Sequence, residues 1–159
     1  MHMLCLNFSH VSHSFTQKIA LHPFTASLKS GRVYAITGPN GSGKSTLLLL
    51  AAQLLKPTEG EISLSIQGKT VSEKIWRTQT ALLAPTLSLY AQLTARENLH
   101  FFLALRGIHL DNAQETSLLS RVGIAKVDID TKRIQAFSTG MRQRLKLATL
   151  LGMQANLWL

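Results

Sequence analysis

Residues 38–46 of the chain read GPNGSGKST. This stretch matches the pattern G-x-x-x-x-G-K-[ST] at Gly38, Gly43, Lys44 and Ser45. The β-rich run VYAIT (33–37) precedes it, and the run LLLLAAQLL (47–55) follows it. The first run predicts a strand, and the second predicts a buried helix because it is apolar on every face. A glycine-rich segment between a strand and a helix is the context in which this pattern binds phosphate groups.

The residue types of this stretch explain that chemistry. Gly41 and Gly43 have no Cβ, so backbone N–H groups can approach an anion and form a concave nest. The start of the following helix adds its positive dipole end. Lys44 offers a cation to β- and γ-phosphates, and the Ser45 hydroxyl is a hard oxygen ligand for Mg²⁺. We therefore predict that nucleotide phosphates bind at Gly38, Pro39, Asn40, Gly41, Ser42, Gly43, Lys44, Ser45 and Thr46.

The composition excludes several other classes of protein. With 159 residues, 45% of them hydrophobic and 16% charged, the chain can bury a core and is not a disordered tail. One cysteine, Cys5, rules out a disulfide framework within the chain and fits a reducing compartment. The longest apolar run, 47–52, is far shorter than the roughly 20 residues that span a bilayer.

Charge is distributed unevenly along the chain. The formal net charge is +9, yet no acidic residue follows Asp130. Such an excess permits nucleic acid, anionic lipid or phosphate as a ligand. No aromatic stacking pattern is interleaved with the basic residues, and they read as a solvated helix face. We therefore expect nucleic acid not to be the partner.

The rest of the sequence predicts an α/β fold with a helical insertion. Strands are expected at Leu4–Phe8, Ala20–Leu28, Glu61–Ile66, Thr80–Ala84 and 156–159. Thr94 with Glu97 forms a capping-box pattern for a helix that ends near Gly107. Two more helices are expected, one over Asp111–Val122 and one that begins with Ser138 as its cap.

Three segments together resemble the ATP-binding cassette (ABC) family. They are GPNGSGKST (38–46), LTARENL (93–99) and FSTGMRQRLKLA (137–148), in the family's order and spacing. The resemblance implies an ABC-type P-loop NTPase with an N-terminal antiparallel β subdomain and a core sheet that is incomplete at the C-terminus. It implies one nucleotide-binding domain over 1–159. Its expected parts are the β subdomain with the phosphate-loop core (1–92), the helical subdomain (93–137), and the signature helix with the start of the Walker B strand (138–159).

The same resemblance implies a site shared by two cassettes. Lys44, Ser45 and Thr46 hold the phosphates and Mg²⁺ of ATP, with Ser45 on the metal. Phe15 corresponds to the aromatic residue that stacks on adenine, although a strand residue in the core is an equal alternative. The signature, which contacts ATP held by the second cassette, comprises Ser138, Thr139, Gly140, Met141, Arg142 and Gln143. The implied partners are that second cassette and a separate transmembrane subunit. The implied location is the cytoplasm, peripheral to the inner face of the cell membrane.

The sequence departs from the family pattern at two places. Pro85 stands where the family has the Gln that senses Mg²⁺ and the membrane partner. The Walker B Asp and Glu and the switch His are absent, because the sequence ends at Leu159, on the strand that precedes them. We therefore expect these residues to bind MgATP weakly at best and not to turn it over.

Three functions remain open at this point. The first is the ATPase subunit of a transporter, seen as an N-terminal fragment or truncated product. The segments ENLHFF (97–102) and ANLWL (155–159) resemble those of the haem-exporter ATPase of cytochrome c maturation. The segment STGMRQRLKLA (138–148) also resembles exporters of drugs or polysaccharides. The second is a cassette ATPase that acts on DNA, ribosomes or iron–sulfur assembly. The third is a nucleotide-binding module that no longer hydrolyses ATP.

Overall fold

The computed structural model describes residues 3–16, 18–83 and 88–159. The chain divides into two compact units, the first formed by Met1–Thr80 with Leu159 and the second by Ala81–Trp158. Pro85, at the expected Gln position, lies outside the described residues.

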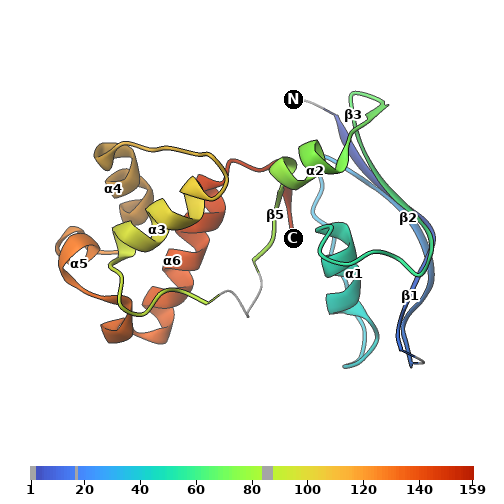
Figure 1. Cartoon of the computed structure of the whole chain (residues 1–159), viewed down its shortest axis with the longest axis horizontal. Coiled ribbons are helices and arrows are strands. Elements are labelled where there is room, and N and C mark those ends of the chain that lie inside the picture. Colours follow the sequence, from blue (N-terminus) through green and yellow to red (C-terminus); the bar gives the residue numbers. More distant parts are fainter. Residues whose placement is uncertain (1–2, 17, 84–87) are drawn as a thin grey trace. The chain divides into compact units, whose positions relative to one another are not determined.

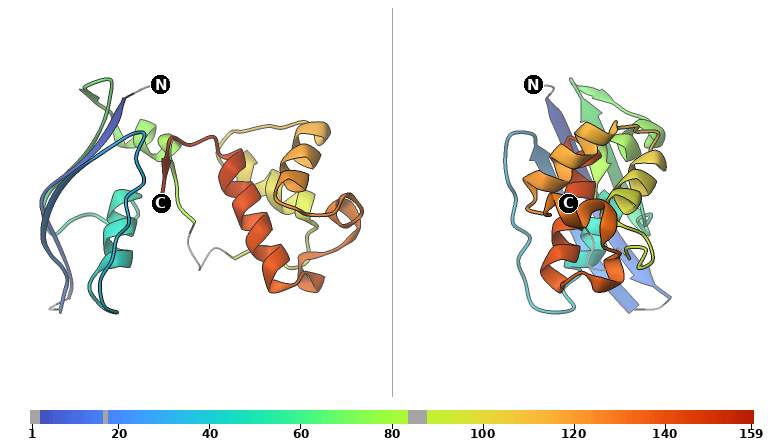
Figure 2. Two further views of the ribbon diagram at one scale, coloured as in Figure 1. Left: turned by 180° about the vertical axis from the view of Figure 1, so that it is seen from behind. Right: turned by 90° about the vertical axis from the view of Figure 1, so that its left-hand side faces the viewer.

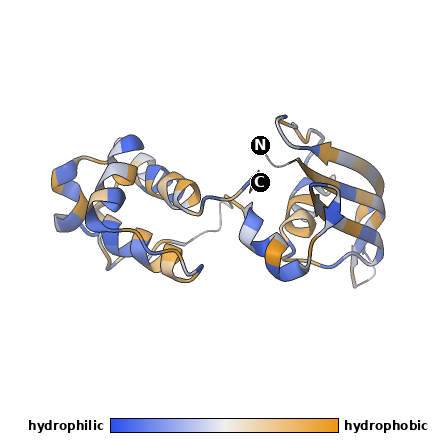
Figure 3. Ribbon diagram, turned by 90° about the horizontal axis from the view of Figure 1, so that it is seen from above, coloured by the Kyte–Doolittle hydropathy of each residue, from blue (hydrophilic) through white to orange (hydrophobic). Residues whose placement is uncertain are grey.

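The first unit is built on a four-stranded antiparallel sheet (Figures 1 and 2). Its strands, in sheet order, are β2 (Lys18–Lys29), β1 (Leu4–Phe15), β3 (Glu59–Ile66) and β4 (Lys69–Thr70). On β1 the buried Leu4, Leu6 and Phe8 alternate with more accessible residues, as expected when one face of a sheet covers a core. Figure 3 accordingly shows both hydrophobic and hydrophilic residues along these strands. The strands predicted at Leu4–Phe8, Ala20–Leu28 and Glu61–Ile66 are confirmed. The first two are longer than predicted and form a long hairpin.

Two helices accompany this sheet. In α1 (Lys44–Ala51), which lies beside it in Figures 1 and 2, Leu47, Leu50 and Ala51 are buried. In α2 (Glu73–Gln79), the buried Trp76 donates from its indole Nε1 to the Ala51 carbonyl at 3.1 Å. This bond ties α2 to the end of α1.

The strand predicted over residues 33–37 is wrong for this structure. No strand is assigned there, and Val33 is fully exposed. A strand needs a neighbour that pairs with its backbone N–H and C=O groups, and none of the described strands pairs with this segment. The helix predicted over 47–55 also differs, because α1 ends at Ala51 and leaves Leu54 64% exposed.

The second unit is mainly helical. It contains α3 (Ala95–Ala104), α4 (Asn112–Arg121), α5 (Lys126–Thr131), the 3₁₀ helix η1 (Ile134–Ala136) and α6 (Thr139–Gly152). The capping box at Thr94 is confirmed, since its hydroxyl accepts from Glu97 N and the Glu97 carboxylate accepts from Thr94 N. A second sheet pairs β5 (Thr80–Ala81) with β6 (Leu157–Trp158), both shorter than predicted.

Apolar side chains from every helix of this unit meet in one core. Its buried members are Ala95, Leu99, Leu103, Leu118, Leu119, Ile124, Ile129, Ile134, Phe137, Leu145 and Ala148. Leu99, Leu119 and Leu145 are completely buried. Burial of a leucine side chain contributes about 2 kcal/mol, so these contacts dominate the stability of the unit.

A polar network centred on Arg96 joins three helices at the edge of this core. The Arg96 guanidinium donates to both carboxylate oxygens of Asp130, at 2.6 and 2.9 Å, and to Glu115 Oε2 at 3.3 Å. The other Glu115 oxygen lies 3.0 Å from His100 Nδ1. Glu115 is 2% exposed, so Arg96 provides the charge partner of a buried carboxylate, and His100 forms a hydrogen bond with it.

This network predicts a loss of stability at low pH. The hydrogen bonds from Arg96 hold the pKa of Asp130 below its ordinary value of 3.8. A carboxylate with a depressed pKa stabilises the fold above its ordinary pKa, and that contribution disappears as the pH falls through the lowered value. We expect Asp130→Asn to cost at most about 1 kcal/mol at pH 7, since the Asp130 side chain is largely exposed. Urea unfolding should show that this cost decreases as the pH falls below the ordinary pKa of 3.8. Equal destabilisation by Asp130→Asn at pH 7 and at pH 2.5 would contradict stabilisation of the fold by the Arg96–Asp130 ion pair.

Candidate nucleotide-binding site

The loop at 38–43 leads directly into α1. Gly43 is the N-cap residue, and no side chain of the described residues caps this helix. The N–H groups of a first helical turn have no partner within the helix, and without a side-chain cap they are free to bind an anion. The start of α1 therefore presents N–H donors of the type that bind an anion.

Lys44 lies over its own loop. Its ammonium donates to the Gly38 carbonyl at 2.9 Å and to the Pro39 carbonyl at 2.7 Å. An ammonium has three N–H donors, so these two bonds position the group and leave the third for another acceptor. That acceptor can be a phosphate oxygen.

Two glycines of the loop have left-handed backbones for different reasons. Gly43 has φ +87°, and a Cβ at this position would collide with the Ala20 carbonyl oxygen of β2. Gly41 has φ +83°, but a Cβ there would meet nothing within 4 Å. Gly43 therefore allows the loop to lie against β2, whereas Gly41 is required only for its backbone angle.

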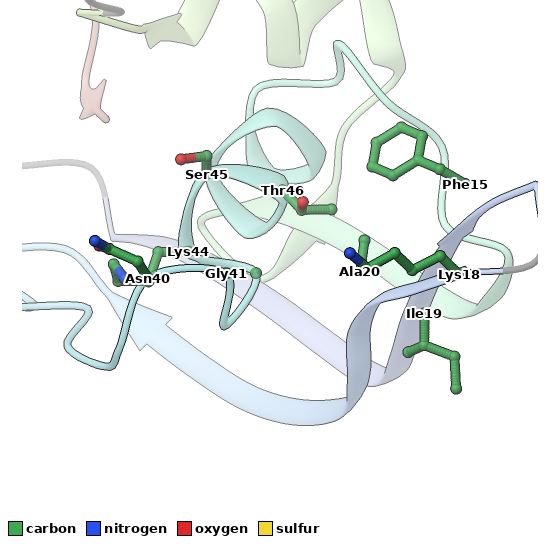
Figure 4. Close-up of a pocket in the computed structure, with 10 residues that line it drawn as sticks. Phe15, Lys18, Ile19, Ala20, Asn40, Gly41, Lys44, Ser45 and Thr46 are labelled. Carbon is green, nitrogen blue, oxygen red and sulfur yellow. The ribbon is translucent and has the colours of Figure 1, made fainter.

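The loop, the start of α1 and the β1–β2 hairpin line an open cavity of about 410 Å³ (Figure 4). Its lining residues are Phe15, Lys18, Ile19, Ala20, Asn40, Gly41, Gly43, Lys44, Ser45 and Thr46. The structure thus brings Phe15 together with six of the nine predicted loop residues. Gly38, Pro39 and Ser42 belong to the loop but do not line the cavity.

Phe15 lies at the end of β1, with its ring available to a ligand. Its side chain is half exposed, and its ring packs edge-to-face on His13 with the ring centroids 4.6 Å apart. His13 is in turn held by a 2.9 Å hydrogen bond between Nδ1 and the Lys56 carbonyl. A carbonyl can only accept, so Nδ1 carries the proton of this bond.

Ser45 lines this cavity and carries a hydroxyl, the type of oxygen ligand that Mg²⁺ accepts. Magnesium in nucleotide sites commonly takes one or two protein oxygens and completes its shell with phosphates and water. The lining residues contain no carboxylate, and no cluster of three or more His, Cys, Asp or Glu side chains that could hold a metal occurs in the described residues. The donor set therefore fits Mg²⁺ delivered with a nucleotide and does not fit a resident metal.

The predicted signature lies in the second unit, at the start of α6. Ser138 is the N-cap residue, and its hydroxyl accepts from Met141 N at 3.2 Å. The Arg142 guanidinium donates to the Ile134 and Gln135 carbonyls at 3.4 and 3.2 Å. Thr139 and Gly140 occupy the first turn of the helix, followed by Gln143. The prediction of a Ser-capped helix is confirmed, and the loop that precedes it is fixed by Arg142.

The lining residues Lys18, Ile19 and Ala20 were not predicted. They begin β2, which the sequence pattern placed only from Ala20 onward. The signal was present in the hairpin, because Phe15 and Lys18 are direct partners across its two strands. A residue that pairs with Phe15 across the hairpin is expected to lie beside the same cavity.

Comparison with known proteins identifies the family. A sequence model described as "ABC transporter" matches residues 21–159, which is most of the chain. The chain belongs to this family. Among solved structures, a putative ABC transporter ATP-binding protein from Pyrococcus furiosus is 25% identical, with a TM-score of 0.81, over 97% of this chain and 73% of that one. The fold is thus that of an ABC-type P-loop NTPase with an N-terminal antiparallel sheet, as predicted.

Curated relatives within the ABC family have several transport roles. The cytochrome c biogenesis ATP-binding export protein CcmA of Cupriavidus pinatubonensis is 34% identical over 84% of this chain and 58% of its own length. The glutamine transport ATP-binding protein GlnQ of Escherichia coli is 31% identical over 97% of this chain and 66% of its own. The first three relatives are matched over only 38 to 59% of their length. In the described part of this ABC chain, no helix is long and apolar enough to cross a membrane.

Proposed function

We propose that this chain is the nucleotide-binding part of an ABC transporter and binds MgATP at the cavity beside α1. The observation that carries the proposal is the convergence of three groups on one cavity. They are the aromatic ring of Phe15, the ammonium of Lys44 and the uncapped start of α1. An aromatic face suits a base, and a cation with free N–H groups suits phosphates.

Each predicted residue has a role in this proposal. The loop from Gly38 to Gly43 surrounds the phosphates, Lys44 binds the β- and γ-phosphates, and Ser45 binds Mg²⁺. Thr46 lines the cavity beside them. Magnesium, when bound with ATP, neutralises charge between the terminal phosphates. The signature residues, from Ser138 to Gln143, would contact ATP held by a second cassette.

The base-binding role of Phe15 can be tested separately from phosphate binding. Stacking of a base on an aromatic ring is worth about 1–3 kcal/mol, so Phe15→Ala should weaken ATP binding about 10-fold. Phe15→Trp keeps an aromatic face and should bind within about threefold of the unaltered chain. Titration with a fluorescent ATP analogue, displaced by unlabelled ATP, measures both. Equal affinity of the alanine variant and the unaltered chain would remove Phe15 from the site.

We propose further that these 159 residues bind ATP without steady turnover. Hydrolysis needs a group that positions or activates water, and no acidic residue follows Asp130 in this sequence. Phosphate release by the 159-residue chain should therefore equal that of its Lys44→Ala variant. Steady release that the Lys44→Ala substitution abolishes would overturn this proposal.

For the transport role we propose export, driven through a separate membrane subunit at the inner face of the cell membrane. Residues 97–102 read ENLHFF, which resembles the corresponding segment of the haem-exporter ATPase, and two CcmA export proteins are 34% identical to the chain over the matched residues. Co-purification with a hydrophobic membrane subunit would support this role. A salt-dependent complex with duplex DNA or RNA would instead support a cassette ATPase that acts on nucleic acid.

A further inference from the structure

Lys18 is a second cation at the nucleotide cavity. It is the first residue of β2 and pairs directly with Phe15 across the hairpin. Side chains at directly opposed positions of an antiparallel pair have their Cβ atoms about 5 Å apart. The side chains of Phe15 and Lys18 therefore leave the backbone side by side at one end of the cavity.

The side chain of Lys18 extends along the cavity and not away from it. Alternation along a strand puts Lys18 and Ala20 on one face and Ile19 on the other. Figure 4 shows the Lys18 side chain extending toward Ala20 and Thr46, while Ile19 points to the opposite side from Phe15. Ala20 is where β2 meets the phosphate-binding loop, because its carbonyl leaves no room for a Cβ on Gly43. Lys18 thus lies between the aromatic ring and the loop.

The electrostatics of the cavity leave Lys18 available for a ligand. The residues that line the cavity include two lysines and no acidic residue. Lys44 is held by two carbonyls of its own loop. In the part of the chain that the structure describes, Lys18 has no ion pair and no side-chain hydrogen bond. An exposed cation beside an acid-free cavity favours an anionic ligand group near it.

We propose that Lys18 binds the α-phosphate of the nucleotide, an assignment that rests on the proposed function. A base stacked on Phe15 and terminal phosphates at Lys44 put the ribose and the α-phosphate between those two residues. Lys18 is the cation that lies there. It is a second phosphate-binding residue, distinct in position and in target from Lys44.

A series of ligands with increasing phosphate number tests this division of roles. Adenosine, AMP, ADP and ATP are each used to displace a fluorescent adenine nucleotide from the 159-residue chain. The variants are Lys18→Gln, Lys44→Ala and, as a matched control, Lys29→Gln. Lys29 ends the same strand that Lys18 begins, is also exposed, and does not line the cavity. Urea unfolding of each variant establishes that it is folded.

The expected result is a different pattern for each lysine. Lys18→Gln should weaken AMP, ADP and ATP by the same factor, roughly 5- to 10-fold for an exposed charge-assisted bond, and leave adenosine unchanged. Lys44→Ala should weaken ADP and ATP while leaving AMP nearly unchanged. Lys29→Gln should change none of the four.

Three outcomes would overturn the assignment. If Lys18→Gln behaves as Lys29→Gln while Lys44→Ala still weakens ATP, Lys18 is not a ligand and the proposed function stands. If Lys18→Gln weakens ADP and ATP but not AMP, its target is not the α-phosphate. If the unaltered chain binds none of the four ligands, the proposed function fails and this assignment fails with it.

Discussion

Replacing Lys44 by alanine is expected to reduce the affinity for MgATP about 30- to 100-fold. Hydrogen bonds to charged groups are worth about 1.5–3 kcal/mol, and the third N–H of this ammonium is the one not held by the loop carbonyls. Isothermal titration calorimetry or displacement of a fluorescent analogue measures the change. The loss should be much larger for ATP and ADP than for adenosine, because Lys44 contacts phosphate groups only.

Lys69→Ala is the control for this substitution. Lys69 is an exposed lysine of β4 and is not among the residues that line the cavity. The Lys69→Ala substitution removes the same charge from the same unit. It should leave the ATP affinity within about twofold of the unaltered chain, since exposed charges are screened at physiological salt. Equal losses of ATP affinity in the two variants would mean that the affinity depends only on the net charge of the protein.

The second large effect is expected at Gly43. A Cβ here meets the backbone of β2, which cannot move aside without distorting the sheet, and the left-handed φ adds strain of about 1–2 kcal/mol. Gly43→Ala should therefore displace the loop and reduce ATP affinity at least about 10-fold. It should also lower the free energy of unfolding by about 2–4 kcal/mol.

Gly41→Ala is the matched comparison. Its backbone angle is nearly the same, +83° against +87°, but the space around its Cβ is open. We expect Gly41→Ala to cost only the strain of the left-handed φ angle, about 1–2 kcal/mol, and to reduce ATP affinity less than Gly43→Ala does. Urea unfolding and ATP titration of the two variants separate steric contact from backbone strain. Equal destabilisation by both substitutions would contradict the contact between Gly43 and β2.

Local signals in the sequence predicted much of this fold. The capping pattern at Thr94, the Ser138 cap and the alternation in β3 depend on residues near one another in the chain, and each is confirmed. The short helices α2 and α5 were missed, because seven and six residues give too little periodicity to recognise. The Arg96 network was missed too, since it joins residues 34 positions apart.

The error at residues 33–37 has a different cause. Their composition favours a strand, but a strand forms only where another one pairs with it, and pairing is not encoded in the run itself. The candidate site shows the same limit. Its loop is contiguous and was predicted residue by residue. Lys18 comes from the start of a strand, and its place beside Phe15 follows from the hairpin register.

Hydrogen exchange of the 159-residue chain with and without saturating MgATP is the direct test of nucleotide binding at the loop before α1. If MgATP binds at this loop, the amides of residues 40–46 should exchange at least about tenfold more slowly with MgATP, because their N–H groups bind phosphate. The hairpin end at Phe15 and Lys18 should also be protected, and Lys44→Ala should abolish both effects at the same ATP concentration. Unchanged exchange over residues 40–46 with ATP demonstrably bound, or equal protection in the Lys44→Ala variant, would contradict phosphate binding by this loop.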